Sequence, residues 1–141
     1  MLTPQQLLSE CVRMAKIAGK IQIGYFRSSH LKVDTKYNDS DVVTEADKRS
    51  EAAIIAEIRR LFPTHSVLSE ESGEDAFVGE YRWVIDPLDG TASFSSGLPG
   101  FCVSIGVEHK GQTVAGVVYA PYLGELFTAT KGGGAYLNGE L

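Results

Sequence analysis

Phe101-Cys102-Val103-Ser104-Ile105-Gly106-Val107 is the stretch that decides the fold. Large apolar side chains alternate in it with small or polar ones, and this alternation predicts a β-strand with one buried face. Further strands are expected over residues 113–120, 125–130 and 135–137, because β-forming segments recur there between turns rich in glycine and proline. The second part of the chain therefore predicts a mostly antiparallel sheet.

Two long helices are expected before these strands. The first should begin after Thr3, because Pro4 suits the first helical position and Gln6 completes a T-x-x-Q capping box. Its apolar residues recur at helical spacing, and the pattern fades near Phe26. Cys11 falls within this apolar stripe and is expected to be a core residue.

The second helix is expected to start at Thr44, where Asp47 would form an acidic variant of the capping box. Apolar residues continue at helical spacing up to Pro63, which marks its end. Residues 29–43, between the two helices, are polar and are expected to form an exposed loop or a loose hairpin. The predicted fold class is α+β, with two long helices packed on a mostly antiparallel sheet.

Composition narrows the possible functions. The chain has 141 residues, of which 43% are hydrophobic and 22% charged, so it suits one globular domain. Its 18 acidic and 13 basic residues give a net charge of −5, so we expect no nucleic-acid partner. An anionic substrate could bind only if something, such as a bound cation, reversed the local field. The first residues resemble no signal peptide, and no apolar run is long enough to span a membrane, so we expect a cytoplasmic protein without a membrane partner.

Acidic residues follow two of the expected strands. Glu70-Glu71 comes after the strand over residues 66–69, and Asp86 comes after the strand over residues 82–85. Neighbouring strand tips can bring Glu70 and Asp86 to one cation, and carboxylates so close together would repel each other without it. The alternative for Glu70-Glu71 is a solvated surface pair.

Asp86 belongs to the motif Asp86-Pro87-Leu88-Asp89-Gly90-Thr91. Carboxylates three residues apart around a tight turn can converge on a hard divalent cation, to which the Leu88 carbonyl could add an oxygen. The amides of residues 90–92 would open a helical turn and offer a seat for phosphate. The alternative is an ordinary type I turn in which Asp is the turn former.

Two further residues have a structural and a chemical interpretation. Asp47 is explained by helix capping and the helix dipole, and Thr91 by a simple cap. A hydroxyl that faces a carboxylate can also orient a water molecule for attack as part of a general-base relay. The three histidines, His30, His65 and His109, are spread along the chain and show no metal-ligand spacing.

The chain resembles the inositol monophosphatase family of Mg²⁺-dependent, lithium-sensitive phosphomonoesterases. The resemblance covers nearly the whole chain and rests on several motifs in order. They are Asp41-Val42-Val43-Thr44-Glu45-Ala46-Asp47, Ser69-Glu70-Glu71-Ser72, Trp83-Val84-Ile85-Asp86-Pro87-Leu88-Asp89-Gly90-Thr91, Val103-Ser104-Ile105-Gly106-Val107 and Gly132-Gly133-Gly134-Ala135-Tyr136-Leu137-Asn138-Gly139.

The resemblance implies a set of metal ligands. Glu70 would bind the first and third metal ions and counts among the catalytic residues. Asp86 would be the bridging carboxylate, the carbonyl of Leu88 would complete the first site, and Asp89 would bind the second ion. The cofactor so implied is Mg²⁺.

The resemblance also implies roles around the substrate. Asp47 and Thr91 would position the attacking water, which makes them catalytic residues. The amides of Gly90, Thr91 and Ala92 would hold the phosphate. Lys36 matches a basic residue on a loop over the site.

The chain departs from the family pattern in two motifs and in its length. Ser69 stands where the family usually has glycine, and Ala92-Ser93 stands where it often has Thr-Asn. The family's second half, with a further metal-binding aspartate in a W-D motif, has no match here, since Trp83 is the only tryptophan. Asn138-Gly139 predicts a hairpin turn that only two residues follow. We therefore expect residues 1–141 to be the N-terminal metal-binding domain of a longer protein, whose C-terminal domain is absent from this chain.

By resemblance, that domain is the first part of a layered αβαβα architecture. The implied activity is hydrolysis of a small, inositol monophosphate-like phosphate monoester by metal-activated water, in a protein that is a homodimer when complete. The alternatives are a histidinol-phosphate or 3′-phosphoadenosine 5′-phosphate phosphatase, or a non-catalytic metal-binding half-domain. Residues 1–141 alone are expected to be inactive.

Overall fold

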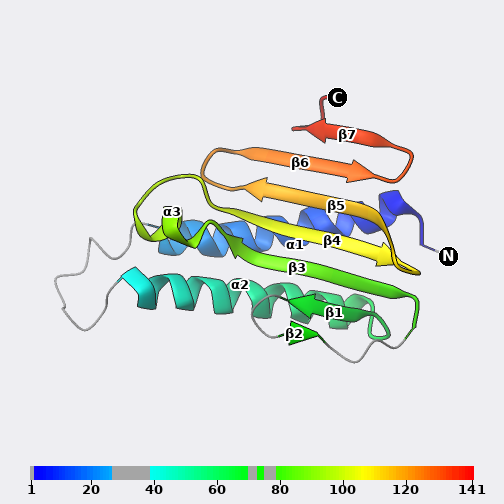
Figure 1. Ribbon diagram of the computed structural model, residues 1–141, viewed down its shortest axis with the longest axis horizontal. Helices are drawn as coiled ribbons and strands as arrows, with labels where there is room; N and C mark the ends of the chain where they lie inside the picture. Colours follow the sequence, from blue (N-terminus) through cyan, green and yellow to red (C-terminus); the bar gives the residue numbers. More distant parts are fainter. Residues whose placement is uncertain (1, 27–38, 70–72, 75–78) are drawn as a thin grey trace.

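The computed structural model describes residues 2–26, 39–69, 73–74 and 79–141. Figure 1 shows two long helices beside a sheet, with a short third helix at one end of the sheet. In chain order the described elements are α1 (Pro4–Tyr25), α2 (Asp39–Leu61), β1 (Ser66–Ser69), β2 (Gly73–Glu74), β3 (Tyr81–Asp89), α3 (Thr91–Ser95), β4 (Cys102–His109), β5 (Gln112–Ala120), β6 (Glu125–Thr130) and β7 (Gly134–Leu137).

The described strands form one sheet in the order β2-β1-β3-β4-β5-β6-β7. Strand β1 pairs with β3 in parallel, and every other neighbouring pair is antiparallel. The predicted α+β fold with a mostly antiparallel sheet is thus confirmed. The strand predicted over residues 82–85 is longer than expected, and the two-residue β2 was not predicted.

One face of the sheet is covered by α1 and α2 and contains the core (Figure 1). Because side chains alternate along a strand, every second residue of the central strands points toward the helices. Burying these side chains between the two layers is the main source of stability for such a fold. The buried strand residues are Val67, Trp83, Ile85, Val103, Ile105, Val107, Ala115 and Val117, and the helices contribute Leu7, Cys11, Met14, Ala15, Ala18, Ile54 and Ile58.

Helix α1 begins as predicted. The Thr3 hydroxyl accepts a hydrogen bond from the Gln6 amide at 3.1 Å, and the Gln6 side chain accepts one from the Thr3 amide at 2.8 Å. This reciprocal pair satisfies two amides that the helix itself leaves without partners. The helix ends at Tyr25, one residue before the predicted fading of its pattern, and Cys11 is fully buried.

Helix α2 begins earlier than predicted. Its first residue is Asp39, so Thr44 lies inside the helix and the capping box expected at Thr44 and Asp47 is wrong. The composition misled the prediction because acidic residues favour a helix's first turn, where the dipole is positive, as much as they favour loops. The expected loop over residues 29–43 is therefore wrong for residues 39–43, and its remainder lies outside the described residues.

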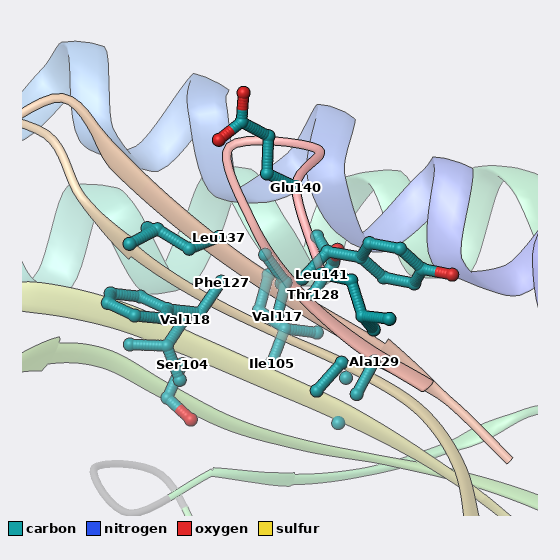
Figure 2. A pocket seen from close by; sticks show the side chains of 14 residues that line it. Ser104, Ile105, Val117, Val118, Phe127, Thr128, Ala129, Leu137, Glu140 and Leu141 are labelled. Atoms are coloured by element: carbon teal, nitrogen blue, oxygen red, sulfur yellow. The ribbon is translucent and has the colours of Figure 1, made fainter. Parts of the chain in front are cut away.

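The other face of the sheet is partly apolar and carries no described helix. Val118, Phe127 and Leu137 are exposed to 38%, 42% and 38% on it, and they lie side by side on β5, β6 and β7. Together with Ser104 and Leu141 they line a shallow groove across these strands (Figure 2). Among the described residues, none of the helices is both long and apolar enough to cross a membrane.

The predicted hairpin turn near the end is present. Asn138 and Gly139 both have positive φ values, of 51° and 82°, as a two-residue hairpin turn of this kind requires. Leu137 and Glu140 exchange two backbone hydrogen bonds, at 2.8 and 3.0 Å, across the turn. The turn thus closes on the last residues of β7.

Candidate active site

The segment Asp86–Asp89 is the last part of β3, and its pairing with β4 is irregular. Asp86 pairs with Ser104 and Asp89 with Cys102, so three steps along β3 face two steps along β4. One extra residue in a strand is a β-bulge, which bends the strand and redirects its side chains. The acidic motif therefore lies on a bulged strand end, and both the type I turn and the tight turn considered from the sequence are wrong.

The bulge separates the acidic residues of the segment from its apolar residues. Pro87 and Leu88 are buried, whereas Asp86 is partly exposed and Asp89 is exposed. The Leu88 side chain packs in a small second core with Ala46, Phe94 and Phe101. The apolar residues thus anchor the bulge in the protein while both carboxylates remain accessible to solvent.

Gly90 joins the bulge to α3. Its φ of 84° lies in the left-handed region, and a Cβ atom at this position would lie 2.7 Å from the carbonyl oxygen of Gly100. Only glycine fits both conditions without a shift of the backbone. The predicted helical turn is confirmed as α3, whose first residues, Thr91 and Ala92, are exposed beside Asp89.

Asp47 lies in the third turn of α2 and is only 6% exposed. Helix capping therefore does not explain this acid. Ala46 and Ser50, on the same buried side of α2, reach toward the bulge, since Ala46 packs with Leu88 and Ser50 contacts Gln22. Asp47 is thus a mostly buried carboxylate on the helix that packs against β3.

Gln22 is a site residue that the sequence analysis missed. It lies in the last turn of α1 and is fully buried, and its side-chain nitrogen donates hydrogen bonds to the Pro87 carbonyl at 2.5 Å and the Ser50 hydroxyl at 3.3 Å. The available signal was its position four residues after Ala18, on the apolar stripe of the helix. A polar residue on such a stripe indicates a buried hydrogen bond.

The tip of β1 is also tied to a helix. Ser69 is buried, and its hydroxyl donates a 2.6 Å hydrogen bond to Glu51 of α2. This contact gives Ser69 a structural role that glycine could not fill. The next predicted ligand, Glu70, and the predicted basic residue Lys36 lie outside the described residues, so their positions remain predictions.

The electrostatics of the bulge favour a cation. The Cys102 thiol lies 3.8 Å from a carboxylate oxygen of Asp89. Burial, together with the negative charges of Asp89 and Asp86, raises the pKa of Cys102 to about 11. Asp86 and Asp89 thus place negative charge beside the thiol. Carboxylate and carbonyl oxygens, such as those of Asp86, Asp89 and Leu88, are the donors that Mg²⁺ prefers.

The described acids do not complete a metal site by themselves. Within residues 2–26, 39–69, 73–74 and 79–141, no three His, Cys, Asp or Glu side chains lie close enough to hold a metal ion. A metal site at this strand end would need a further ligand from outside these residues. At the last described pair of β1 and β3, Ser69 lies beside Ile85, so Glu70 follows β1 where Asp86 follows Ile85.

Known proteins are similar to nearly the whole of this chain. The profile of the inositol monophosphatase family matches residues 3–141. The chain is 47% identical over 134 residues to "Nus factor SuhB" of Pasteurella multocida, and 39% identical over 142 residues to "Inositol monophosphatase 2" of Solanum lycopersicum. These matches cover 94% and 96% of the chain but only 50% and 52% of the relatives.

A solved structure shares the fold. The inositol monophosphatase from Anabaena superposes with a TM-score of 0.81 at 41% identity, over 96% of this chain and 48% of that one. The chain thus spans about half the length of the relatives it matches. It belongs to the inositol monophosphatase family.

Proposed function

We propose that this chain supplies the metal-binding acids of a Mg²⁺-dependent phosphatase that hydrolyses a small, inositol monophosphate-like phosphate monoester. The observation that carries the proposal is the bulge at Asp86–Asp89. It presents two carboxylates at the end of β3, directly before the left-handed Gly90 and the first turn of α3. An anionic substrate can bind next to acids only if a cation lies between them.

Four groups would hold the metal: the side chains of Glu70, Asp86 and Asp89 and the carbonyl oxygen of Leu88. Two observations support this set, namely the parallel pairing of β1 with β3 and the negative charge beside the Cys102 thiol. A bound Mg²⁺ would stabilise negative charge on the phosphate and lower the pKa of a water molecule.

The remaining roles belong to the chain's own polar groups. We assign the orientation of the attacking water to Asp47 and Thr91, with Glu70 beside them as a catalytic carboxylate. The amides of residues 90–92 precede or open α3, so helical hydrogen bonding leaves them free to orient the phosphoryl oxygens. These amides need no reorganisation, because Gly90 already holds the backbone in the required turn.

The whole activity requires more than these 141 residues. The matched relatives are about twice as long, and the part of them that this chain does not match would supply the wall that orients the alcohol. We propose that this second half packs on the open face of the sheet, where Val118, Phe127 and Leu137 are exposed. Positioning of the substrate accounts for roughly 7–11 kcal/mol of a barrier. Residues 1–141 alone should therefore not turn over a phosphomonoester, and the alcohol itself, including histidinol or a nucleotide, is selected outside this chain.

A hybrid protein tests the proposal. Residues 1–141 are joined to the second half of the Pasteurella multocida relative, and turnover of inositol monophosphate is measured with Mg²⁺. Asp86→Asn should lower turnover by at least about a thousandfold, because it removes a ligand charge, and Thr91→Ala should lower it less while leaving metal affinity unchanged. A folded hybrid without turnover, or an Asp86→Asn hybrid with normal turnover, would contradict the assignment.

A second candidate is a non-catalytic role. It is favoured by the names of the relatives at 45–47% identity, which are called Nus factor SuhB and not a phosphatase. The same hybrid separates the candidates in a SuhB-deficient strain, where Asp86→Asn should abolish complementation only if catalysis is required. The expected absence of a nucleic-acid partner and the homodimer remain predictions.

A further inference from the structure

We propose that Gln22 is a positioning residue that fixes the shape of the Asp86–Asp89 bulge and thereby sets the affinity of this strand end for a divalent cation. The inference rests on the proposed function only in taking Asp86, Asp89 and the Leu88 carbonyl as ligands. Its structural basis is the hydrogen bond between the Gln22 side chain and the Pro87 carbonyl.

The bulge creates the need for this hydrogen bond. The regular register between β3 and β4 is interrupted between Asp86 and Asp89, so Pro87 and Leu88 face β4 without regular pairing. Pro87 is fully buried, and a buried carbonyl without a donor is costly. Gln22 meets that need from α1, 65 residues away in the sequence.

The orientation of the Gln22 amide follows from its neighbours. The side-chain nitrogen lies 2.5 Å from the Pro87 carbonyl oxygen and 3.3 Å from the Ser50 hydroxyl. The reverse orientation would place two carbonyl oxygens against each other, so the nitrogen must face Pro87. The Gln22 oxygen is buried, and no group in the described part of the chain bonds to it.

This unbonded oxygen argues against a purely structural role. An apolar side chain of the same size would leave the Pro87 carbonyl without a donor, but it would bury no unpaired oxygen of its own. Glutamine at this position gains less stability than its size suggests, and what it adds is a donor aimed at the bulge. The geometry therefore assigns Gln22 to the control of the backbone at Pro87.

The position of the Pro87 backbone influences the directions of the proposed metal ligands on either side of it. Asp86 and Leu88 flank Pro87 in the chain, and the Pro87 carbonyl belongs to the peptide that joins Pro87 to Leu88. Leu88 is fixed on one side by its packing with Phe94 and Phe101. Gln22 fixes the carbonyl at the other side. If that bond is lost, the peptide can rotate and change the directions of the Asp86 carboxylate and the Leu88 carbonyl together.

The test uses the 141-residue chain and four variants. Gln22→Met removes the donor and keeps the length of the side chain, whereas Ser50→Ala removes only the second acceptor. Met14→Ala is the matched stability control, because Met14 is buried on the same helix and belongs to the main core, away from the bulge. Asp86→Asn is the ligand control. Mn²⁺ serves as the probe, with free Mn²⁺ measured by electron paramagnetic resonance.

Two readouts are compared. Gln22→Met should raise the Mn²⁺ dissociation constant about tenfold, the size typical of residues that orient metal ligands. It should also speed hydrogen exchange in a peptide covering residues 86–92. Ser50→Ala and Met14→Ala should leave both readouts within about twofold of the unmodified chain, even though Met14→Ala lowers the melting temperature through its cavity.

The outcomes distinguish this inference from the proposed function. If Gln22→Met keeps the Mn²⁺ affinity and the exchange rates of the unmodified chain, the role of Gln22 is overturned. If Met14→Ala weakens Mn²⁺ binding as much as Gln22→Met, the effect is general destabilisation and the inference is again overturned. If Asp86→Asn binds Mn²⁺ as well as the unmodified chain, the metal assignment fails, while hydrogen exchange still decides whether Gln22 holds the bulge.

Discussion

The two ends of strand β3 are held in place by different kinds of contact. At its start, Tyr81 and Trp83 take part in stacked aromatic rings that join β3 to its neighbours. At its end, the bulge at Asp86–Asp89 is held by the Gln22 hydrogen bond, the Leu88 side chain and the left-handed Gly90. The first end depends on contact area that several rings share, whereas the second depends on a few individual contacts.

The rings at the start of β3 form a ladder of Phe62, His65, Tyr81 and His109. Successive ring centroids are 4.7, 4.5 and 4.4 Å apart, with interplanar angles of 3°, 24° and 17°. The Trp83 indole lies beside this ladder and donates a 3.0 Å hydrogen bond to Nδ1 of His65. Two histidines that are far apart in the sequence, His65 and His109, thus both stack on the ring of Tyr81.

This difference separates stability from function along a single strand. A strand end that several stacked rings hold tolerates the loss of one polar contact. An end built for ligands must keep carboxylates exposed and a backbone in a rare conformation, which costs stability. Substitutions at the ladder should therefore change unfolding, and substitutions at the bulge should change metal binding out of proportion to unfolding.

The largest expected effect belongs to Trp83→Ala. Trp83 is fully buried, and removing a buried indole should lower the free energy of unfolding by about 3–5 kcal/mol. Urea unfolding followed by far-UV circular dichroism measures this, since Trp83 is the only tryptophan. Mn²⁺ affinity of the folded variant should stay within about twofold, because the proposed site lies at the other end of the strand. A strong loss of Mn²⁺ affinity would break the proposed separation of the two ends.

Gly90→Ala should have the next largest effect. The left-handed backbone and the 2.7 Å approach to the Gly100 oxygen predict a loss of about 1–3 kcal/mol in unfolding free energy. Mn²⁺ affinity should fall about tenfold or more, because Gly90 directly follows Asp89, which we propose as a ligand. Both quantities are measured as for Trp83→Ala.

Gly111→Ala is the matched control for this substitution. Gly111 has a similar φ of 80°, but a Cβ atom there would meet nothing within 4 Å. It should therefore lose stability through its backbone conformation alone and leave Mn²⁺ binding unchanged. Equal effects of the two substitutions on Mn²⁺ binding would show that the close approach at Gly90 has no role in the site.

The sequence predicts much of the fold because the relevant signals are local. The capping box at Thr3 and Gln6 and the alternation from Phe101 to Val107 each lie within a few residues, and both predictions are confirmed. The start of α2 was wrong because residues 39–43 have a composition that suits a loop and a helical first turn equally well. Local composition does not separate these two states.

The candidate site is less predictable for a physical reason. Its acids are visible as a motif, but the bulge depends on the pairing of β3 with β4, and the support from Gln22 depends on how α1 packs against β3. Both are long-range contacts that no local pattern encodes. The pairing of Trp83 with His65 is hidden in the same way, since neither residue has a spacing that suggests the other.

The smallest effect expected here is a pH dependence at the ladder. His65 is partly buried, and burial lowers its pKa below the ordinary value of 6.5. Its Nδ1 also accepts the hydrogen bond from Trp83, which a protonated imidazole cannot do. The neighbouring groups are the rings of Phe62 and Tyr81, with Glu80 and His109 beyond Tyr81. The folded protein therefore favours neutral His65 more strongly than the unfolded chain does.

A group whose pKa is lower in the folded state binds fewer protons there, so stability is complete above the unfolded pKa of 6.5 and is lost as the pH falls toward the folded pKa. The free energy of unfolding should thus decrease from pH 7.5 to pH 5.5. This decrease should be smaller than the loss caused by Trp83→Ala or by Gly90→Ala, because a single partly buried group titrates. Urea unfolding of the unmodified chain and of His65→Gln, whose side-chain oxygen can still accept from Trp83, measures the decrease. His65→Gln should show a smaller decrease over this range, while Mn²⁺ binding at pH 7.5 is the same in both proteins. An equal decrease in the two proteins would assign the pH dependence to groups other than His65. His65 would then contribute no pH-dependent stability to this end of β3.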